Sequence, residues 1–240
     1  MLSFGTSGIR GLYGSEITPS LALRVANAFS EPGLALGTDT RKTSPILEKA
    51  AASGAMAAGK DAISLGVVPT PVLAFATLKH KCNGIMVTAS HNPPGYNGLK
   101  LISGGREINK TEENKVISAY QAGVELAPWD RNGNYSADEQ ILDSYFGLVL
   151  PQLEGEAIRS KKPKVVLDCN GAGRAATPIL LEKLGCEVVA INMQEQGFSR
   201  PSEPSEKNLA QLREKVREVG ADMGLAHDGD GDRISLVDEK

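Results

Sequence analysis

The stretch Val165–Ile191, VVLDCNGAGRAATPILLEKLGCEVVAI, decides the fold of this chain. It begins with an apolar run of strand type, Val165–Asp168, continues with helical spacing of apolar residues over Ala175–Leu184, and ends in a second apolar run, Cys186–Ile191. A strand, a helix and a second strand in this order are typical of a βαβ unit, whose two strands lie parallel in one sheet. The stretch therefore predicts an α/β fold.

The same alternation extends over the rest of the sequence. Thr18-Pro19 and Ser44-Pro45 are each typical of a helix N-cap followed by proline at the first helical position. Further strands are expected at Gly33–Gly37, Ala62–Leu65, Gly84–Thr88 and Asp222–Ala226, and further helices at Pro19–Phe29, Ile46–Gly59, Lys110–Ala122, Asp138–Leu153 and Lys207–Val219.

This alternation predicts mixed, mostly parallel sheets with helices on both faces. The turn-forming run Arg131–Asn134 precedes a long helix and a new βαβ series. We therefore expect two domains, residues 1–135 and residues 136–240.

The composition is that of a soluble globular protein. Of the 240 residues, 41% are hydrophobic and 23% are charged, and the net charge is −3. So mild a charge favours neither nucleic acid nor a membrane surface as a partner, and no apolar run has the length of a membrane span. Cys82, Cys169 and Cys186 are odd in number, widely spaced and without a metal-binding pattern. We expect a reducing, cytoplasmic location.

The segment Ala226–Arg233, AHDGDGDR, places three carboxylates at alternate positions. Asp228, Asp230 and Asp232 are separated only by glycine, so three like charges repel one another at close range. Side chains at alternate positions of an extended segment point the same way, and the glycines let the backbone bend so that the oxygens converge. Because Mg²⁺ prefers oxygen ligands in a near-octahedral shell, the segment predicts a magnesium site.

Two other interpretations apply to this acidic segment. An EF-hand calcium loop also carries acidic residues at alternate positions, and Glu239 would supply its last ligand. However, Arg233 stands where that loop needs glycine, and the flanking runs are of strand type rather than helical. A solvated acidic turn stays open as the simpler alternative, because Asp-Gly pairs are often turns. The apolar flanks favour a strand end, where α/β proteins carry their sites.

A second candidate segment is Thr88–Lys100, TASHNPPGYNGLK. It follows an apolar strand, so Ser90 is expected just past a carboxyl end, exposed as a nucleophile or phosphate carrier. His91 and Lys100 would supply a proton-transfer group and a cation within a tight loop. An ordinary loop of turn residues stays open. A hydrolase triad fits less well, because a histidine adjacent in sequence cannot easily turn back onto the serine.

Two polar segments near the N-terminus are weaker signals. Phe4–Gly11, FGTSGIRG, is a glycine-rich loop that contains Arg10, but it lacks the lysine and spacing of a P-loop. By itself it is better explained as a flexible turn. Thr38–Arg41, TDTR, follows an expected strand and places Arg41 where it can pair with Asp39.

Considered together, Gly5–Gly11, Thr88–Pro93 and Asp228–Arg233 resemble the three motifs of the α-D-phosphohexomutase family. That family has an N-terminal loop, a phosphoserine loop and a metal loop in this order, and the pattern is most similar to archaeal and bacterial phosphoglucosamine mutases and phosphomannomutase/phosphoglucomutases. The resemblance runs from residue 2 to the last residue. It covers the first and most of the second of the family's four domains.

The resemblance implies the roles of the motif residues. Ser90 would carry the transferable phosphoryl group, and Asp228, Asp230 and Asp232 would hold one Mg²⁺ together with an oxygen of the phosphorylated Ser90. The remaining implied site residues are His91 and Lys100 for proton transfer, Arg10 as a catalytic residue that offsets phosphate charge, and Arg233, Thr6 and Ser7 for binding phosphate.

The implied reaction moves a phosphoryl group between the 1- and 6-positions of a hexose phosphate. The substrate would be glucosamine, mannose or glucose phosphate, and a hexose 1,6-bisphosphate would be both intermediate and activator. The family's later sugar-recognition and phosphate loops are not found, so we expect little mutase activity from this chain without a C-terminal half; association with that half or with a second copy is expected. Two alternatives stay open: a metal-dependent phosphatase, and a non-catalytic half of a split protein that binds sugar phosphate or a partner.

Overall fold

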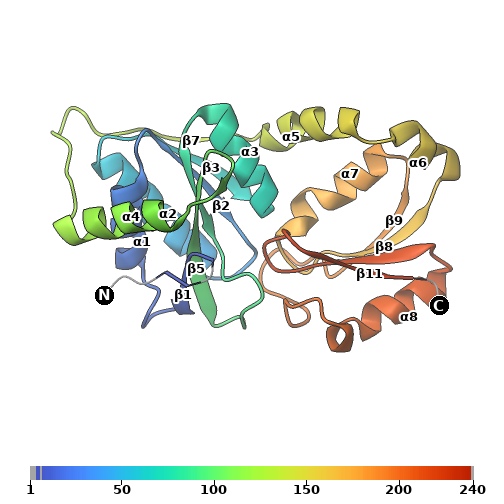
Figure 1. Cartoon of the computed structure of the whole chain (residues 1–240). Coiled ribbons are helices and arrows are strands. Elements are labelled where there is room, and N and C mark those ends of the chain that lie inside the picture. Colours follow the sequence, from blue (N-terminus) through green and yellow to red (C-terminus); the bar gives the residue numbers. More distant parts are fainter. Residues whose placement is uncertain (1–3, 6, 239–240) are drawn as a thin grey trace.

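A computed structural model describes residues 4–5 and 7–238 as two α/β units that lie next to each other (Figure 1). The first unit is built on a seven-stranded sheet and the second on a four-stranded sheet. Helices cover both faces of each sheet, as Figure 1 shows. The predicted mixed α/β fold is confirmed.

The first unit alternates strands and helices through most of its length. Its strands are β1 (Ile9–Leu12), β2 (Leu34–Thr38), β3 (Ala62–Val67), β4 (Asn83–Val87), β5 (Tyr96–Ser103), β6 (Arg106–Glu107) and β7 (Tyr135–Ala137). Its helices are α1 (Pro19–Phe29), α2 (Ser44–Ala57), α3 (Thr70–His80) and α4 (Lys110–Ala122).

The second unit repeats this alternation on a smaller scale. Its strands are β8 (Lys164–Asp168), β9 (Glu187–Ile191), β10 (Met223–His227) and β11 (Ile234–Val237). Helix α5 (Ile141–Val149) leads from the first unit to the second, as Figure 1 shows. The α-helices of the second unit are α6 (Gly155–Lys161), α7 (Thr177–Lys183) and α8 (Ala210–Val219), with short 3-10 helices η1 (Leu150–Gln152), η2 (Ala172–Ala175) and η3 (Glu206–Asn208).

The strand order brings the carboxyl ends of the central strands together. In the first sheet the order is β1-β5-β4-β2-β3-β7, where β4, β2, β3 and β7 run parallel and β5 is antiparallel to β1 and β4. In the second sheet the order is β11-β10-β8-β9, and only β11 runs antiparallel to its neighbour. The loops after β4 and β10 each leave the carboxyl end of a strand, which is the usual position of a site in α/β folds.

Each sheet has a hydrophobic core on either face. Helices α1, α2 and α4 pack on one face of the first sheet, and α3 and α5 pack on the other. Helix α8 covers one face of the second sheet and α7 the other. Strand β7 pairs with β3, so the segment at the expected domain boundary adds to the first sheet. The division into residues 1–135 and 136–240 stays a prediction.

The structure tests the two helix N-caps that the sequence predicts. Thr18 is the N-cap of α1, and its Oγ1 accepts a hydrogen bond from Leu21 N at 3.1 Å, as predicted. The prediction for Ser44 is wrong: Ser44 is the first residue of α2, and Thr43 precedes it without a side-chain cap. The hydroxyl of Ser44 instead donates to Asp39 Oδ1 at 2.8 Å.

Two expected loops contain strands. Arg10 lies in β1 rather than in a flexible turn, and Lys100 lies in β5 rather than in a tight loop. Gly98, within β5, looks like a turn residue but is required by close packing. A Cβ at Gly98 would lie 2.4 Å from the carbonyl oxygen of Ile9 and 2.7 Å from that of Thr88, so only glycine lets β5 pass between its neighbours.

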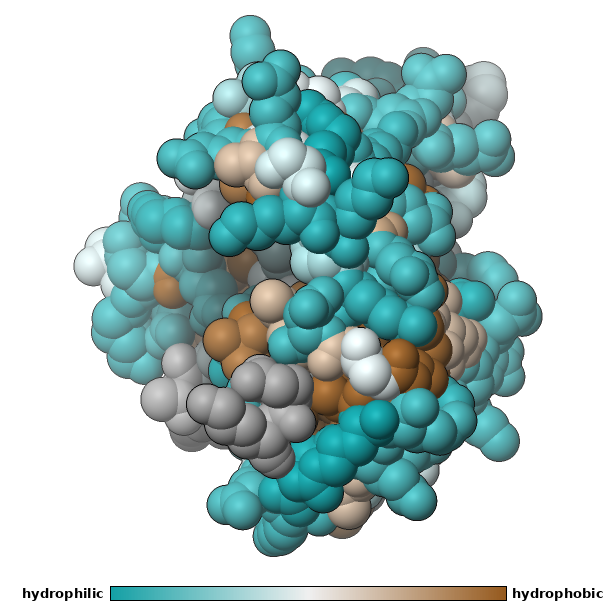
Figure 2. Space-filling model, turned by 90° about the vertical axis from the view of Figure 1, so that its right-hand side faces the viewer, coloured by the Kyte–Doolittle hydropathy of each residue, from teal (hydrophilic) through white to brown (hydrophobic). Residues whose placement is uncertain are grey.

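The far end of the second unit shows a mixed surface. Figure 2 shows this face as largely hydrophilic, with apolar side chains gathered around its lower centre. Strand β11 is the edge of its sheet and carries the exposed side chains of Ile234 and Leu236. Among the described helices, none is long and apolar enough to cross a bilayer.

Candidate metal and phosphoryl-transfer site

Ser90 lies in the loop that follows β4 and faces the second unit. Its φ is 47°, in the left-handed region that residues other than glycine seldom adopt. The expected exposed position is wrong: its side chain is buried, because it packs against the acidic turn, and its Oγ donates a hydrogen bond to Asp228 Oδ2 at 2.9 Å. The fold thus brings the predicted serine against the predicted acidic segment, 138 residues later in the chain.

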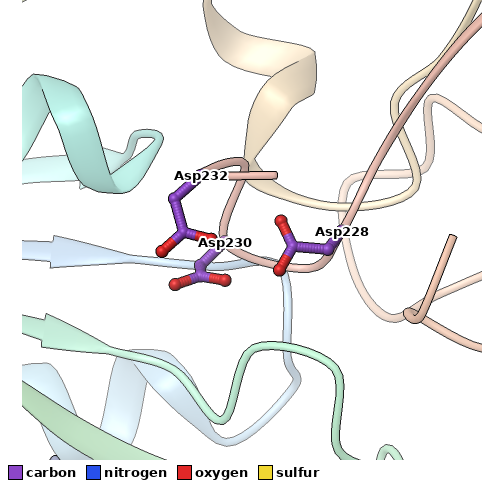
Figure 3. Close-up of side chains that lie close together, drawn as sticks. All are labelled: Asp228, Asp230 and Asp232. Atoms are coloured by element: carbon purple, nitrogen blue, oxygen red, sulfur yellow. The ribbon is translucent and has the colours of Figure 1, made fainter. Parts of the chain in front are cut away.

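The acidic segment forms the turn between β10 and β11, so its flanks are strands, as expected. Oxygens of Asp228, Asp230 and Asp232 all lie within 4.8 Å of one another. Figure 3 shows the three carboxylates on one side of the turn, directed toward segments of the first unit. Asp228 and Asp230 are fully buried, whereas Asp232 borders a cavity.

The carboxylates fit a hard divalent cation. Three like charges this close, two of them buried, are stable only with positive charge nearby. Asp230 Oδ1 is buried, and no residue in the described ranges gives it a hydrogen bond. An all-oxygen set with an unused lone pair is the donor chemistry that Mg²⁺ prefers. Asp228, Asp230 and Asp232, with Ser90 beside them, are therefore the residues that would hold it.

Lys100 supplies part of the compensating charge. Its Nζ lies 2.8 Å from Asp230 Oδ2 and 2.7 Å from Asp232 Oδ2, and the side chain is 2% exposed. Burial alone would lower the pKa of the amine, but Asp230 and Asp232 outweigh it and raise the pKa above its ordinary value. Lys100 is therefore held as an ammonium ion beside the site.

Thr70, at the start of α3, is a site residue that the sequence did not reveal. Its Oγ1 donates to Asp230 Oδ2 at 2.9 Å, and its backbone N–H donates to the carbonyl oxygen of Asp230 at 2.9 Å. The positive end of the helix also favours a carboxylate. Helix α3 was not among the expected elements, although Thr70-Pro71 repeats the threonine–proline pair that marked α1.

Arg233 connects the acidic turn with the serine loop. Its Nε donates to Asp228 Oδ2 at 3.1 Å, and its Nη2 lies 3.4 Å from Ser90 Oγ and 2.8 Å from His91 Nδ1. Glu203 Oε1 accepts from Nη1 at 3.3 Å. His91 is thus in contact with a cation rather than with the hydroxyl of its neighbour, and Glu203 is a contact that the sequence did not reveal.

A cavity of about 530 Å³ opens beside these groups. The cavity is lined by the cationic residues Arg10, Lys100 and Arg233, and Ser90 lies at its edge. Arg10 Nε is buried, and the described part of the chain offers it no hydrogen-bond partner. Such a cavity suits a ligand with several anionic oxygens. The cavity is also lined by Gly5, Ser7, His91, Asn92 and Asp232.

The remaining predicted residues lie near this cavity or outside the described ranges. The hydroxyl of Ser7 donates to both carboxylate oxygens of Glu107, at 3.0 and 2.9 Å, so it is engaged by a side chain. Thr6 and Glu239 are not among the described residues.

Comparison with known proteins connects this geometry with a family. A family model described as phosphoglucomutase/phosphomannomutase, alpha/beta/alpha domain I, matches residues 1–126, and the corresponding model for domain II matches residues 143–240. The chain belongs to the phosphoglucomutase/phosphomannomutase family. The family expected from the three motifs is therefore confirmed.

Relatives of the family match this chain over its whole length. A "Probable phosphoglucosamine mutase" of Methanosarcina barkeri is 40% identical over 247 residues, covering 100% of this chain and 56% of that protein. A "Phosphoglucomutase/phosphomannomutase" of Thermococcus kodakarensis is 38% identical, covering 98% and 55%. The crystal structure of a phosphoglucomutase/phosphomannomutase family protein from Burkholderia thailandensis superposes with a TM-score of 0.82 at 29% identity, covering 100% and 56%. The chain spans about half the length of these relatives.

We expect the metal affinity of the acidic turn to depend on pH. Burial and the charges of Asp230 and Asp232 raise the pKa of Asp228 to about 7, and the hydrogen bond from Ser90 only partly offsets this. A metal ion binds the carboxylate, so a proton on Asp228 must leave first. We expect the Mg²⁺ affinity to rise with pH up to about 7 and to level off above it.

Titration calorimetry between about pH 6 and pH 8 checks this expectation. Buffers of different ionisation enthalpy should reveal proton release on binding below pH 7 and little above it. An affinity that stays constant across this range, with no proton release, would contradict the predicted state of Asp228.

Proposed function

We propose that this chain is the phosphoserine- and metal-bearing half of a phosphohexomutase. The enzyme would move a phosphoryl group between the 1- and 6-positions of glucosamine, mannose or glucose phosphate, through a hexose 1,6-bisphosphate. The observation that carries the proposal is the contact of Ser90 Oγ with Asp228 Oδ2 at 2.9 Å, at the edge of a cavity with cationic walls. The relatives' names support the same activity.

The proposed chemistry needs positioning and charge neutralisation more than bond-making by the protein. In one half-reaction, a sugar hydroxyl attacks the phosphorus of phosphorylated Ser90, the O–P bond to Ser90 breaks, the proton of the hydroxyl passes to Ser90 Oγ, and a bisphosphorylated sugar results. After the sugar turns over, Ser90 Oγ takes up the other phosphoryl group. A bound Mg²⁺ would supply electrostatic stabilisation of the charge that develops on the phosphoryl oxygens.

The chain's own residues serve distinct parts of this proposal. Arg233 reaches Ser90 Oγ and Asp228 together, so it can offset the charge of a phosphate on Ser90. Lys100 lies between two carboxylates at the lining of the cavity, where its charge offsets theirs, and its expected part in proton transfer belongs to the proposal. Arg10 would bind the second phosphate, and His91 would contribute to proton transfer. The proposal also includes the substrate, which would be glucosamine, mannose or glucose phosphate, and a cytoplasmic location. It further includes association with a C-terminal half or with a second copy of the chain.

Intact mass spectrometry tests the proposal. We expect the purified chain, incubated with glucose 1,6-bisphosphate and Mg²⁺, to gain the mass of one phosphate, mapped to Ser90 and absent from Ser90→Ala. Because the family's sugar contacts are expected in the C-terminal half, we expect little complete turnover of hexose monophosphate by this chain alone. A chain that never acquires phosphate on Ser90 from any hexose bisphosphate would overturn the proposal.

The same experiment separates the two alternatives. A metal-dependent phosphatase would lose the label from Ser90 to water, as inorganic phosphate, whether or not a sugar monophosphate is added. A non-catalytic module would bind sugar phosphate, measured by calorimetry, without any change of mass. Transfer of the label to added sugar monophosphate distinguishes the mutase half from both.

A further inference from the structure

We infer that Arg41 is a positioning residue whose guanidinium fixes the loop that presents Ser90 to the acidic turn. The inference rests on the proposed function, because it concerns the reactivity of Ser90. Arg41 does not line the cavity beside Ser90 and touches none of the three aspartate side chains through a hydrogen bond. It acts instead through the backbone of the loop.

The terminal nitrogens of the Arg41 guanidinium donate all their hydrogen bonds to one short segment, residues 90–96. Nη2 donates to the carbonyl oxygens of Ser90 at 2.9 Å and Asn92 at 2.7 Å. Nη1 donates to those of Pro93 at 2.7 Å and Tyr96 at 2.9 Å. Four backbone carbonyl groups of this loop thus accept hydrogen bonds from one planar guanidinium group. An ammonium group, which is a compact point charge, cannot hold four such groups in this geometry.

The conformation of Ser90 explains why the loop needs this support. A left-handed φ at a residue other than glycine is strained and persists only where surrounding groups fix it. The carbonyl that Arg41 Nη2 holds belongs to Ser90 itself, where φ is 47°. Release of that carbonyl would let the backbone relax and turn Ser90 Oγ away from Asp228.

Arg41 is itself fixed from two sides. Asp39 Oδ2 accepts from Arg41 Nε at 3.0 Å, and Asp39 Oδ1 accepts from the Arg41 backbone N–H at 2.9 Å, so the pair expected from the sequence forms. The side chains of both residues are fully buried. An arginine in this setting adopts one conformation, which suits it to position other groups.

The second unit contributes to the same arrangement. The guanidinium of Arg41 lies over the ring of Phe198 at 4.9 Å, a cation–π contact across the boundary between the units. Thr40 Oγ1 also donates to the carbonyl oxygen of Gly197 at 3.0 Å. Arg41 therefore connects the placement of the serine loop with the placement of the unit that carries the acidic turn.

Arg41→Lys tests the inference, because it keeps the positive charge that Asp39 needs and removes the fork. We expect the rate at which hexose 1,6-bisphosphate phosphorylates Ser90 to fall by at least about 100-fold, as for a reacting atom displaced by about 1 Å. The Mg²⁺ affinity, measured by calorimetry, should fall far less than this rate, because Asp228, Asp230 and Asp232 stay in the turn. Hydrogen exchange should accelerate in the peptide covering residues 88–97 and not in the β-strands of the second unit.

Arg24→Lys is the matched control. Arg24 is also an arginine over an aromatic ring, 4.0 Å from that of Tyr120, and Nη2 donates to the Tyr120 carbonyl oxygen at 3.2 Å, within the helical layer of α1 and α4. This variant should keep the wild-type phosphorylation rate. Phe198→Leu is a milder second variant if Arg41→Lys does not fold, and it should slow phosphorylation in the same direction by more than it lowers the metal affinity.

The possible outcomes separate the inference from the function on which it rests. Wild-type phosphorylation by Arg41→Lys, or parallel loss of phosphorylation, metal affinity and fold in both test variants, would overturn the positioning role. If the wild-type chain is never phosphorylated, the proposed function fails. The exchange measurement then still decides the inference, because unchanged protection of residues 88–97 in Arg41→Lys would overturn it.

Discussion

Lys100→Met is expected to destabilise the metal-free chain by about 3–5 kcal/mol, the range for breaking a buried ion pair on one side. Methionine keeps most of the side-chain volume but leaves Asp230, which is fully buried, without its cation. Asp232 loses the same partner at 2.7 Å. Urea unfolding in the presence of a chelator measures the loss.

Divalent metal should restore much of this stability. A cation bound by the three carboxylates replaces the charge of Lys100 and binds only the folded state, so it stabilises that state by mass action. We therefore expect the stability gap between the Lys100→Met and wild-type chains to narrow in saturating Mg²⁺. A gap that is equally large with and without metal would contradict the view that Lys100 and the ion compensate the same charges.

Lys79→Met is the matched control for the charge change. Lys79 Nζ pairs with Asp138 Oδ2 at 2.8 Å, a similar distance, but its side chain is 33% exposed. Water screens such a pair, so its loss should cost less than about 1 kcal/mol. A loss for Lys79→Met as large as that for Lys100→Met would show that burial does not set the cost.

The central contact of the site could be predicted from the sequence because its residues break the rules of ordinary folding. Three aspartates separated by glycine are costly without a cation, and Ser90 follows a clear apolar strand. The alternating βαβ elements then place Ser90 and the acidic turn each at the carboxyl end of a strand, β4 in the first sheet and β10 in the second. That a serine of the first unit meets acids of the second was implied by the resemblance of the three motifs, in their order, to those of the family.

The residues that the sequence did not reveal act through features without a one-dimensional pattern. Arg41 was expected to pair with Asp39, but its four other acceptors are backbone carbonyls, whose positions depend on the path of the whole loop. Lys100 was assigned to a loop because Asn97 and Gly98 are typical turn residues. The close approach of two neighbouring strands, which requires Gly98, is a tertiary fact that propensity does not encode.

Gly171→Ala is expected to destabilise the chain by about 2–5 kcal/mol, adding backbone strain to steric displacement. Gly171 follows β8 with φ 156° and ψ −151°, a region that is essentially restricted to glycine. A Cβ there would also lie 2.4 Å from the carbonyl oxygen of Gly229, which is backbone of the acidic turn between Asp228 and Asp230. The turn must therefore shift, and we expect a weaker Mg²⁺ affinity together with the loss of stability.

Gly147→Ala is the same substitution at a position where we expect it to increase the stability rather than decrease it. Gly147 lies exposed within α5 and has nothing within 4 Å of an added Cβ, so alanine should stabilise the helix by about 0.5–1 kcal/mol. Urea unfolding of both variants, with Mg²⁺ titration of each, separates a general effect of alanine from displacement of the turn. Gly171→Ala with wild-type stability and metal affinity would mean that the turn tolerates movement at Gly229, and that the close packing of these two loops does not set the geometry of the three carboxylates.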